Sequence, residues 1–312
     1  MDMEKTNDIV VTILTLAYNH EPYIRQCLDG ILMQQTNFKF ELLIHDDAST
    51  DGTANIIREY ELKYPEIIKP IYQKENQYSK KVPIGVTYLY PRAKGKYIAL
   101  CEGDDYWTDP LKLQKQVDFL EANPDFVMCS HKFLNYNETT KTYTNFYDFD
   151  GDSIFDINHF ILRKDWLTQP LTLMFRRSAL ALEEYMEYQN AKDVTLCYHI
   201  LKKGKGLLLD DVMGVYRIHE GGIWQGTTRV LRIKSELETV LGIDKKDKDV
   251  VSSKLVKNTL FNFGYLGVSF FRKYIKLYLR CLYVIYQKQG FKECVYLMNR
   301  TANYFRTMNF TL

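Results

Sequence analysis

The stretch GKYIALCEGDDYW, residues 95–107, begins as an apolar strand and ends in a cluster of acidic residues. Glu102, Asp104 and Asp105 follow the apolar residues directly, and Asp109 comes shortly afterwards. Carboxylates so close together repel one another, which is unfavourable unless a cation or strong hydrogen-bond donors neutralise them. The stretch therefore predicts a ligand-binding site at the end of a buried strand.

The sequence before residue 125 alternates between strand patterns and helix patterns. Near-continuous apolar runs predict strands at DIVVTILTLAYN (8–19), FELLIHDD (40–47), EIIKPIYQ (66–73) and KYIALCEG (96–103). Helical spacing of apolar residues, or helix-capping residues, predict helices at 21–35, 49–65, 82–95 and 109–124. This α/β alternation with short links predicts a mostly parallel sheet flanked by helices on both faces.

Beyond residue 125 the alternation is less regular. Strand patterns are found at 125–136, 141–149, 170–175 and 207–219, and helical patterns at 155–166, 176–188 and 192–204. After residue 227 only helical periodicity remains. We therefore expect a helical extension behind the α/β part of the chain.

The formal net charge of +2 hides an uneven distribution. Residues 1–227 hold 25 Lys and Arg against 33 Asp and Glu, whereas residues 228–312 hold 16 against 6. The two parts are therefore expected to face different partners, or each other. The six cysteines form no CxxC pair, which indicates reduced core thiols of a cytoplasmic protein. Neither a signal peptide nor a membrane-spanning helix is expected from the sequence.

Acidic residues also follow the second predicted strand. In open parallel sheets, ligands bind beyond the carboxyl ends of the strands, so residues 17–20, 45–53 and 101–107 would share one rim. Asp46 and Asp47 lie in the second of these loops and can accept hydrogen bonds from a base N–H or a ribose hydroxyl. The loop is not a calcium site of the EF-hand type, because Arg58 stands where that loop needs a glutamate.

The acids at 102, 104 and 105 are spaced to converge on one hard cation. Mg²⁺ and Mn²⁺ prefer carboxylate oxygens and leave coordination positions open for phosphate oxygens. Asp109, in contrast, is expected to cap the following helix. The chain lacks G-x-G-x-x-G and a P-loop, so a nucleotide would be held by carboxylates and a metal rather than by a glycine-rich loop.

These motifs together resemble the nucleotide-binding half of family 2 glycosyltransferases, which have the Rossmann-like GT-A fold. The resemblance is specific over residues 8–130 and continues more weakly to residue 224. It implies a catalytic domain at 1–227, made of a nucleotide-sugar-binding half (8–130) and an acceptor half (131–227). The basic helical region would then occupy residues 228–312.

The resemblance also implies an activity. A hexosyltransferase of this type moves a sugar from a nucleotide-diphosphate sugar to a glycan or lipid-linked acceptor with inversion, in polysaccharide biosynthesis for the cell envelope. Mn²⁺ or Mg²⁺ would neutralise the departing diphosphate. The Q-x-x-R-W motif of processive synthases is missing, so we expect one sugar to be added per encounter.

For residues that match the family motifs, the resemblance implies the roles that these positions have in the family. Asp46 and Asp47 would meet the base or ribose, and the border of the nucleotide would be formed by Ala17, Tyr18 and Asn19. Glu102-Gly103-Asp104 stands where Asp-x-Asp is usual, and Asp104 and Asp105 would bind the metal. The longer side chain of Glu102 leaves open whether it touches the ribose, the metal or neither.

The acceptor half supplies the other expected site residues. Asp193, at the start of a predicted helix, matches the position of the catalytic base, although Lys192 precedes it and the carboxylate could simply cap the helix. Asp165 and Asp211 are the alternative bases. Arg217 and His219 would lie near the diphosphate, with His219 as an additional metal ligand. The other histidines are expected to have no role, with His45 simply packed or hydrogen-bonded at its strand end.

The basic extension contains FFRKYIKLYLRCLYVIYQK, residues 270–288. Arg272, Lys276 and Arg280 share one helical face, and another is filled by Phe271, Tyr274, Ile275, Tyr278, Leu282 and Ile285. This pattern predicts either an amphipathic helix lying on an anionic membrane, at its inner face, or a helical bundle with a basic solvated face. No nucleic-acid partner is expected.

Two other functions are compatible with an acidic rim on an α/β sheet. A nucleotidyltransferase also uses acidic metal ligands, but its glycine-rich, basic phosphate loop is missing after the first strand. A non-catalytic nucleotide-sugar-binding module would have no need for intact acids at 47, 104, 105 and 193. The identities of the sugar, the acceptor and the linkage do not follow from the sequence.

Overall fold

The computed structural model describes residues 8–147, 151–162, 168–189, 191–222, 226–261 and 267–308. The chain forms two compact units. The first comprises residues 1–157, 166–185 and 196–219, and the second comprises residues 158–165, 186–195 and 220–312. No helix in the described part of the chain combines the length and the apolar character needed to cross a membrane.

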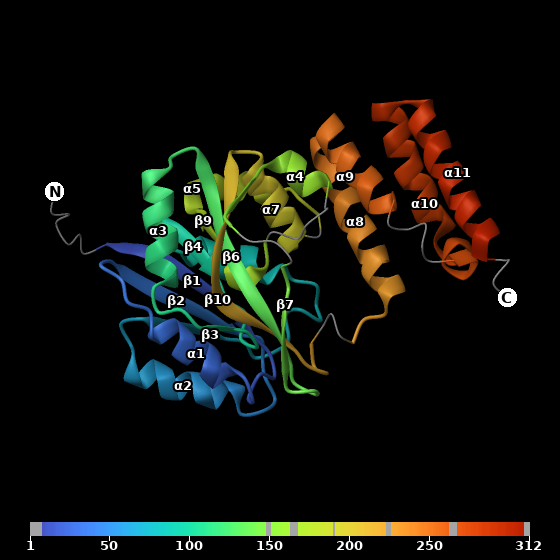
Figure 1. The fold of residues 1–312 in the computed structure, drawn as a ribbon. Helices are drawn as coiled ribbons and strands as arrows, with labels where there is room; N and C mark the ends of the chain where they lie inside the picture. Colours follow the sequence, from blue (N-terminus) through green and yellow to red (C-terminus); the bar gives the residue numbers. More distant parts are fainter. Residues whose placement is uncertain are drawn as a thin grey trace. The chain divides into compact units, whose positions relative to one another are not determined.

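The first unit is built on a sheet whose first four strands are parallel. The strands are β1 (Ile9–Ala17), β2 (Lys39–Asp46), β3 (Ile68–Tyr72) and β4 (Tyr97–Leu100), in the order β3-β2-β1-β4. Their β-branched and apolar side chains are buried because helices cover the sheet, as Figure 1 shows for the blue and teal part of the chain. The predicted α/β architecture is therefore confirmed.

Helices pack on this sheet through their apolar faces. Residues Ile24, Cys27, Leu28 and Ile31 of α1 (Ile24–Leu32) are fully buried. Helix α2 (Thr53–Lys63) lies beside α1, and the hydroxyl of Tyr60 donates to Asp29 over 2.7 Å. Helix α3 (Lys112–Ala122) packs on strand β6 (Phe126–Asn137). Each fully buried aliphatic side chain contributes about 1.5–3 kcal/mol, so this layer fixes the strand ends that form the rim.

The rest of the sheet brings distant segments back to the same edge. Strand β9 (Met174–Arg176) runs antiparallel between β4 and β6. The long strand β10 (Lys205–Ile218) is parallel to β6 and antiparallel to the short β5 (Tyr106–Trp107), with Val215 opposite Tyr106. Strands β7 (Thr142–Asn145) and β8 (Ser153–Phe155) add to β6 and β10. The end of β10 thus lies against the acidic stretch after β4.

Several local predictions were wrong. Helix α3 begins at Lys112 with Leu111 at the N-cap position, and Asp109 instead accepts the backbone N–H of Leu111 over 2.8 Å. The helix expected at 82–95 is a π-turn followed by a 3₁₀-turn (Gly85–Leu89 and Tyr90–Arg92). The strand expected at 170–175 begins as a 3₁₀-turn (Pro170–Thr172).

The helix expected at 176–188 is also different. It is split into α5 (Arg177–Leu180) and α6 (Leu182–Met186), because Ala181 has a φ of 40°. That left-handed backbone conformation cannot continue an α-helix. The helix expected at 155–166 is seen as α4 (Ile157–Leu162), because Phe155 still belongs to strand β8, and residues 163–166 lie outside the described part of the chain.

The second unit is helical. Figure 1 shows the helices α8 (Arg229–Asp247), α9 (Val250–Phe261), α10 (Gly267–Gln289) and α11 (Phe291–Met308) in orange and red. Each packs against the next, and α10 also contacts α8. Tyr278, Leu282 and Ile285 of the predicted apolar face are buried in this bundle, while Lys276 and Arg280 are exposed. The helix α7 (Asp193–Leu201) begins in this unit and ends in the first.

Candidate functional site

The site lies at the rim formed by the carboxyl ends of β1, β2 and β4. Ala17 and Asp46 are register partners at the ends of the first two strands, and the backbone N–H of Asp47 donates to the carbonyl of Ala17 over 2.9 Å. The backbone N–H of Gly103 donates to the carbonyl of Leu16 over 2.9 Å. The three loops predicted to share one rim therefore do share it.

The first two loops are tied to each other. Asn19, with a φ of 55°, donates its backbone N–H to the hydroxyl of Ser49 over 2.9 Å and accepts the backbone N–H of Thr50 on its amide oxygen over 2.8 Å. The Asn19 side chain thus holds the loop after β2 in place. The neighbouring Tyr18 is 43% exposed, so its ring is accessible to a ligand. Glu21 caps α2 by accepting the N–H of Gly52, a contact between loops that the sequence did not reveal.

The two aspartates at the end of β2 differ in their contacts. Asp47 is buried and accepts the backbone N–H groups of Gln77 and Tyr78 over 2.7 and 3.0 Å, so both oxygens hold the 76–79 loop. Asp46 is equally buried, but its Oδ1 has no hydrogen-bond partner. A buried carboxylate oxygen without a donor is unfavourable in the free protein. Asp46 therefore has an acceptor available for a ligand N–H or hydroxyl.

The acidic stretch after β4 forms one cluster. Oxygens of Glu102, Asp104 and Asp105 all lie within 4.8 Å of one another. Burial raises the pKa of Asp105 well above its usual range, and the neighbouring charges of Asp104 and Glu102 add to that shift. The turn has glycine at position 103 because a Cβ there would lie 2.9 Å from Nδ1 of His20 and 3.0 Å from the carbonyl oxygen of Leu16.

Two imidazoles flank Asp104. Its Oδ2 lies 3.0 Å from Nε2 of His219 and 3.8 Å from Nε2 of His20. Burial pushes the pKa of Asp104 upward, but the contact with His219 and the charge of His20 outweigh it, and the pKa is lowered. Burial lowers the pKa of His20, which favours its neutral form. His20, for which the sequence predicts no role, thus lies beside Asp104.

Arg217 is held by protein groups rather than left open. Its Nε donates to the carbonyl of Asp104 over 2.8 Å, and its backbone N–H donates to Oδ1 of Asp105 over 2.8 Å. The two terminal nitrogens bind Glu138 and Gln26. The side chain is 5% exposed, and the guanidinium lies over the rings of Tyr23 and Tyr106. Arg217 thus fixes the acidic turn.

Sequence reasoning missed His20, Gln26 and Glu138. Gln26 lies on α1 and Glu138 directly follows β6, so neither carries a local motif. Their partner Arg217 is 191 and 79 positions away in the sequence. His20, in contrast, could have been found, because it belongs to one of the strand ends that define the rim.

The residues present fit a divalent cation. The set combines carboxylates whose mutual repulsion a cation would relieve with the imidazole of His219, which binds Asp104. Asp104 is the more accessible ligand, because its side chain is 18% exposed while Asp105 is 2% exposed. Asp104 and the partly buried Glu102 are therefore the side chains of this cluster that a ligand can reach.

The expected base, Asp193, belongs to the second unit and is the first residue of α7. It accepts the N–H of Val194 over 2.8 Å, and the ammonium of Lys192 binds the hydroxyl of Ser235. Of the alternatives, Asp211 forms an ion pair with Lys115 over 2.6 Å, and Asp165 lies outside the described residues.

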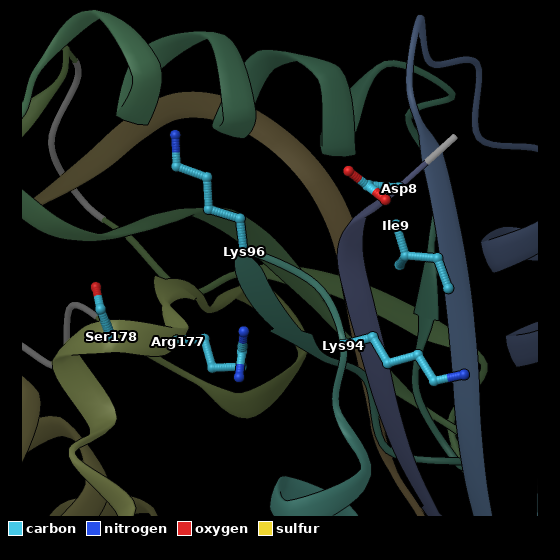
Figure 2. Close-up of a pocket in the computed structure, with 6 residues that line it drawn as sticks. All are labelled: Asp8, Ile9, Lys94, Lys96, Arg177 and Ser178. Atoms are coloured by element: carbon cyan, nitrogen blue, oxygen red, sulfur yellow. The ribbon is translucent and has the colours of Figure 1, made fainter. Parts of the chain in front are cut away.

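A cavity of about 800 Å³ lies at the opposite ends of the strands, before β1 and β4. Figure 2 shows Lys94, Lys96 and Arg177 around it, together with Asp8. Lys96 is neutralised by Glu121, and Arg177 donates to the carbonyl of Gly95. Among the described residues that line the cavity, Asp8 is the acid, and the carboxylates that lie close enough together to hold a metal are those of the acidic rim.

A model described as glycosyl transferase family 2 matches residues 12–183. An uncharacterized protein of Mycobacterium tuberculosis is 34% identical over 69% of this chain, which spans 60% of that relative's length. An Escherichia coli protein described as UDP-Glc:α-D-GlcNAc-diphosphoundecaprenol β-1,3-glucosyltransferase is 28% identical over 75% of this chain and 87% of its own.

Solved structures share the fold at low sequence identity. Staphylococcus aureus TarS 1–349, in complex with UDP-GlcNAc, has a TM-score of 0.67 at 15% identity and covers 96% of this chain and 90% of its own. A mannosyltransferase of Pyrobaculum calidifontis, in complex with GDP-Man and Mn²⁺, has a TM-score of 0.54 at 18% identity and covers 96% and 88%. The architecture of the chain is thus the GT-A fold.

Proposed function

The chain belongs to glycosyl transferase family 2, and from that premise we propose that it transfers a hexose from a nucleoside-diphosphate sugar to a glycan or lipid-linked hydroxyl. The transfer would proceed with inversion and would need a divalent metal. One sugar would be added per encounter, because the motif of processive synthases is absent from the sequence. The observation that carries the proposal is the pairing of an acid cluster at Asp104 with the unpartnered Asp46 oxygen on one rim.

The donor would lie along that rim. Asp46 can accept a hydrogen bond from the base or ribose, and Asp47 shapes the same wall by holding the 76–79 loop. Ala17, Tyr18 and Asn19 border this space at the end of β1. The S. aureus and P. calidifontis structures, which contain UDP-GlcNAc and GDP-Man, support a nucleotide sugar as the ligand of this fold.

Asp104 and Asp105 would hold Mn²⁺ or Mg²⁺, together with His219 and with Glu102 close by. The bound metal would supply positive charge to the diphosphate leaving group. Arg217 acts on the donor site through the turn, because it binds both the Asp104 carbonyl and the Asp105 carboxylate. A rigid turn keeps the acidic ligands in one arrangement and lowers the ordering cost of binding.

Inversion requires one carboxylate that takes the proton of the acceptor hydroxyl as it attacks. We assign this role to Asp193, whose position at the first turn of α7 leaves its carboxylate at a helix end. The E. coli relative, whose described acceptor is a diphosphoundecaprenol-linked sugar, supports a lipid-linked or glycan acceptor in cell-envelope polysaccharide synthesis. Six free cysteines, all buried, support a cytoplasmic location.

A panel of nucleotide sugars tests the proposal. We expect one UDP-, GDP- or dTDP-sugar to raise the melting temperature of the protein in Mn²⁺ and to lose that effect in EDTA. Transfer to a diphospholipid-linked sugar would then release the nucleoside diphosphate. Release of pyrophosphate from a nucleoside triphosphate would instead identify a nucleotidyltransferase, and donor binding without turnover would identify a binding module.

A further inference from the structure

The outer face of α10 carries exposed aromatic and basic side chains together. Leu279, Tyr283 and Tyr286 are 54%, 64% and 50% exposed, and their spacing puts them on one side of the helix. Lys276 and Arg280 are exposed beside them and form no ion pair within the described part of the chain. This stripe differs from the apolar face predicted by the sequence, of which Tyr278, Leu282 and Ile285 are buried in the bundle.

A groove within the second unit opens beside the stripe. It has a volume of about 420 Å³ and lies between α8 and α10. Leu241, Leu279, Tyr283 and Val284 give it apolar walls, and Lys245 and Arg280 line it with two cations. The acid that lines the groove, Asp244, is buried, and its Oδ1 accepts a hydrogen bond from the hydroxyl of Ser252 over 2.7 Å.

We infer that the outer face of α10 and the adjoining groove bind the surface of an anionic phospholipid bilayer. The phosphate of a headgroup fits between Lys245 and Arg280, and the aliphatic walls fit the glycerol and upper acyl carbons. Tyrosine rings favour the level of the headgroups because one end is apolar and the other polar. This binding is independent of the sugar that is transferred, and it would bring the enzyme to an acceptor carried by a membrane lipid.

Charge complementarity favours a bilayer over other apolar partners. Residues 228–312 hold 16 Lys and Arg against 6 Asp and Glu, so the unit is attracted to an anionic surface. Each basic residue near such a surface strengthens binding by about 5-fold at low salt. The attraction is screened at high ionic strength, because the Debye length falls to about 3 Å at 1 M salt.

Co-sedimentation of the full chain with vesicles tests the inference. We expect binding to phosphatidylglycerol-containing vesicles, weak binding to pure phosphatidylcholine, and release at high salt. The double variant Lys276→Glu and Arg280→Glu should bind at least about 25-fold more weakly, because two attractive charges become repulsive. Lys69→Glu with Lys94→Glu, at exposed positions of the first unit, changes the net charge equally and should retain binding.

The aromatic part of the face needs its own variants. Tyr283→Ser with Tyr286→Ser should weaken vesicle binding, whereas Leu62→Ser, at an 83% exposed position of α2, should not. In Tyr283→Trp, vesicles should shift the tryptophan emission to shorter wavelength, a readout that does not require the charge variants to fold. Far-UV circular dichroism and cooperative thermal unfolding serve as the folding controls for every variant.

Absence of binding to anionic vesicles at low salt would overturn the inference, as would equal binding by the α10 charge variant and its control. A wild-type dimer that the tyrosine variant converts to a monomer, with no change in vesicle binding, would identify this face as an interface between two copies. None of these results depends on whether the chain transfers a sugar.

Discussion

The loops after β2 and after β4 are both acidic, but their carboxylates are satisfied in different ways. Both carboxylate oxygens of Asp47 accept backbone N–H groups of the 76–79 loop, so the charge of Asp47 is stabilised by the protein itself. Glu102, Asp104 and Asp105 face one another within 4.8 Å, and the pKa of Asp105 is raised by burial and by its acidic neighbours. Asp47 in the first loop therefore has a structural role. In the second loop the carboxylates repel one another, and a bound cation would reduce that repulsion.

This difference shows that acid count alone does not identify a metal site. The decisive quantity is how many protein donors each carboxylate already has. Asp46 stands between the two cases, because one oxygen accepts the N–H of Ser49 over 3.4 Å and the other has no partner. The contrast can be tested by substitutions at each loop.

The largest effect is expected at the β4 loop. Asp104→Asn or Asp105→Asn should abolish Mn²⁺-dependent UDP binding, a loss of more than about 100-fold, since even indirect partners of metal ligands contribute 10–100-fold. Isothermal titration calorimetry with and without EDTA measures this. Asp109→Asn is the matched control, because Asp109 is already bound to Leu111 and Lys115. Full UDP affinity in both cluster variants would remove the metal assignment.

The next largest effect is expected on turnover, at Asp193, which belongs to neither of the two loops. Asp193→Asn should leave UDP affinity unchanged and lower turnover by about 10²–10⁴-fold, the usual contribution of a general base. Steady-state transfer assays with the cognate acceptor would show it. Asp211→Asn, whose carboxylate pairs with Lys115, should keep near wild-type turnover. Unchanged turnover in the Asp193 variant would reduce Asp193 to a helix cap.

At the β2 loop, we expect a substitution of Asp47 to affect the stability of the fold more than nucleotide affinity. Asp47→Ala should lower the free energy of unfolding by about 2–3 kcal/mol, because two backbone donors lose a charged acceptor. Urea denaturation measures the change. Asp46→Asn should instead weaken nucleotide binding with little change in unfolding. A loss of stability in Asp46→Asn, with a loss of nucleotide binding but no loss of stability in Asp47→Ala, would contradict the roles assigned to the two aspartates.

The smallest effect is expected at Lys112, a buried amine that has neither a hydrogen-bond partner nor a cation site around it. Lys112 is fully buried, its Nζ lies 3.7 Å from the ring centroid of Trp107, and it has no hydrogen-bond partner. Lys112→Met should therefore raise the free energy of unfolding by about 1–2 kcal/mol at neutral pH, because an unpaired polar group leaves the core.

Lys112 also predicts a pH dependence. Burial lowers the pKa of Lys112 to about 7, while the unfolded chain keeps a pKa of about 10.4. Between these values the unfolded state binds one more proton, so the wild-type free energy of unfolding rises by up to about 1.4 kcal/mol per pH unit relative to Lys112→Met. Other titrating groups cancel in that difference. A constant difference from pH 7 to 10 would contradict the prediction.

The sequence by itself determined the parallel half of the sheet and the acidic rim. Continuous apolar runs specify buried strands, short links keep them parallel, and residues that follow parallel strands must meet at one edge. For that reason Asp46, Asp47 and the cluster from Glu102 to Asp105 could be placed together without coordinates. The N-cap of α3, in contrast, was mispredicted, because Leu111 holds that position and the Asp109 side chain accepts the backbone N–H of Leu111 in the turn before the helix.

Only the tertiary structure decided which distant groups complete the site and which helical faces stay exposed. Arg217 reaches Asp104 and Asp105 because β10 pairs with β5 and β6, a pairing between segments more than 60 positions apart that no local pattern encodes. The same holds for α10, where two apolar stripes share one helix and only contacts with neighbouring helices determine which is buried. Periodicity fixes the faces of an element, but the partner that covers a face is selected by packing between remote parts of the chain.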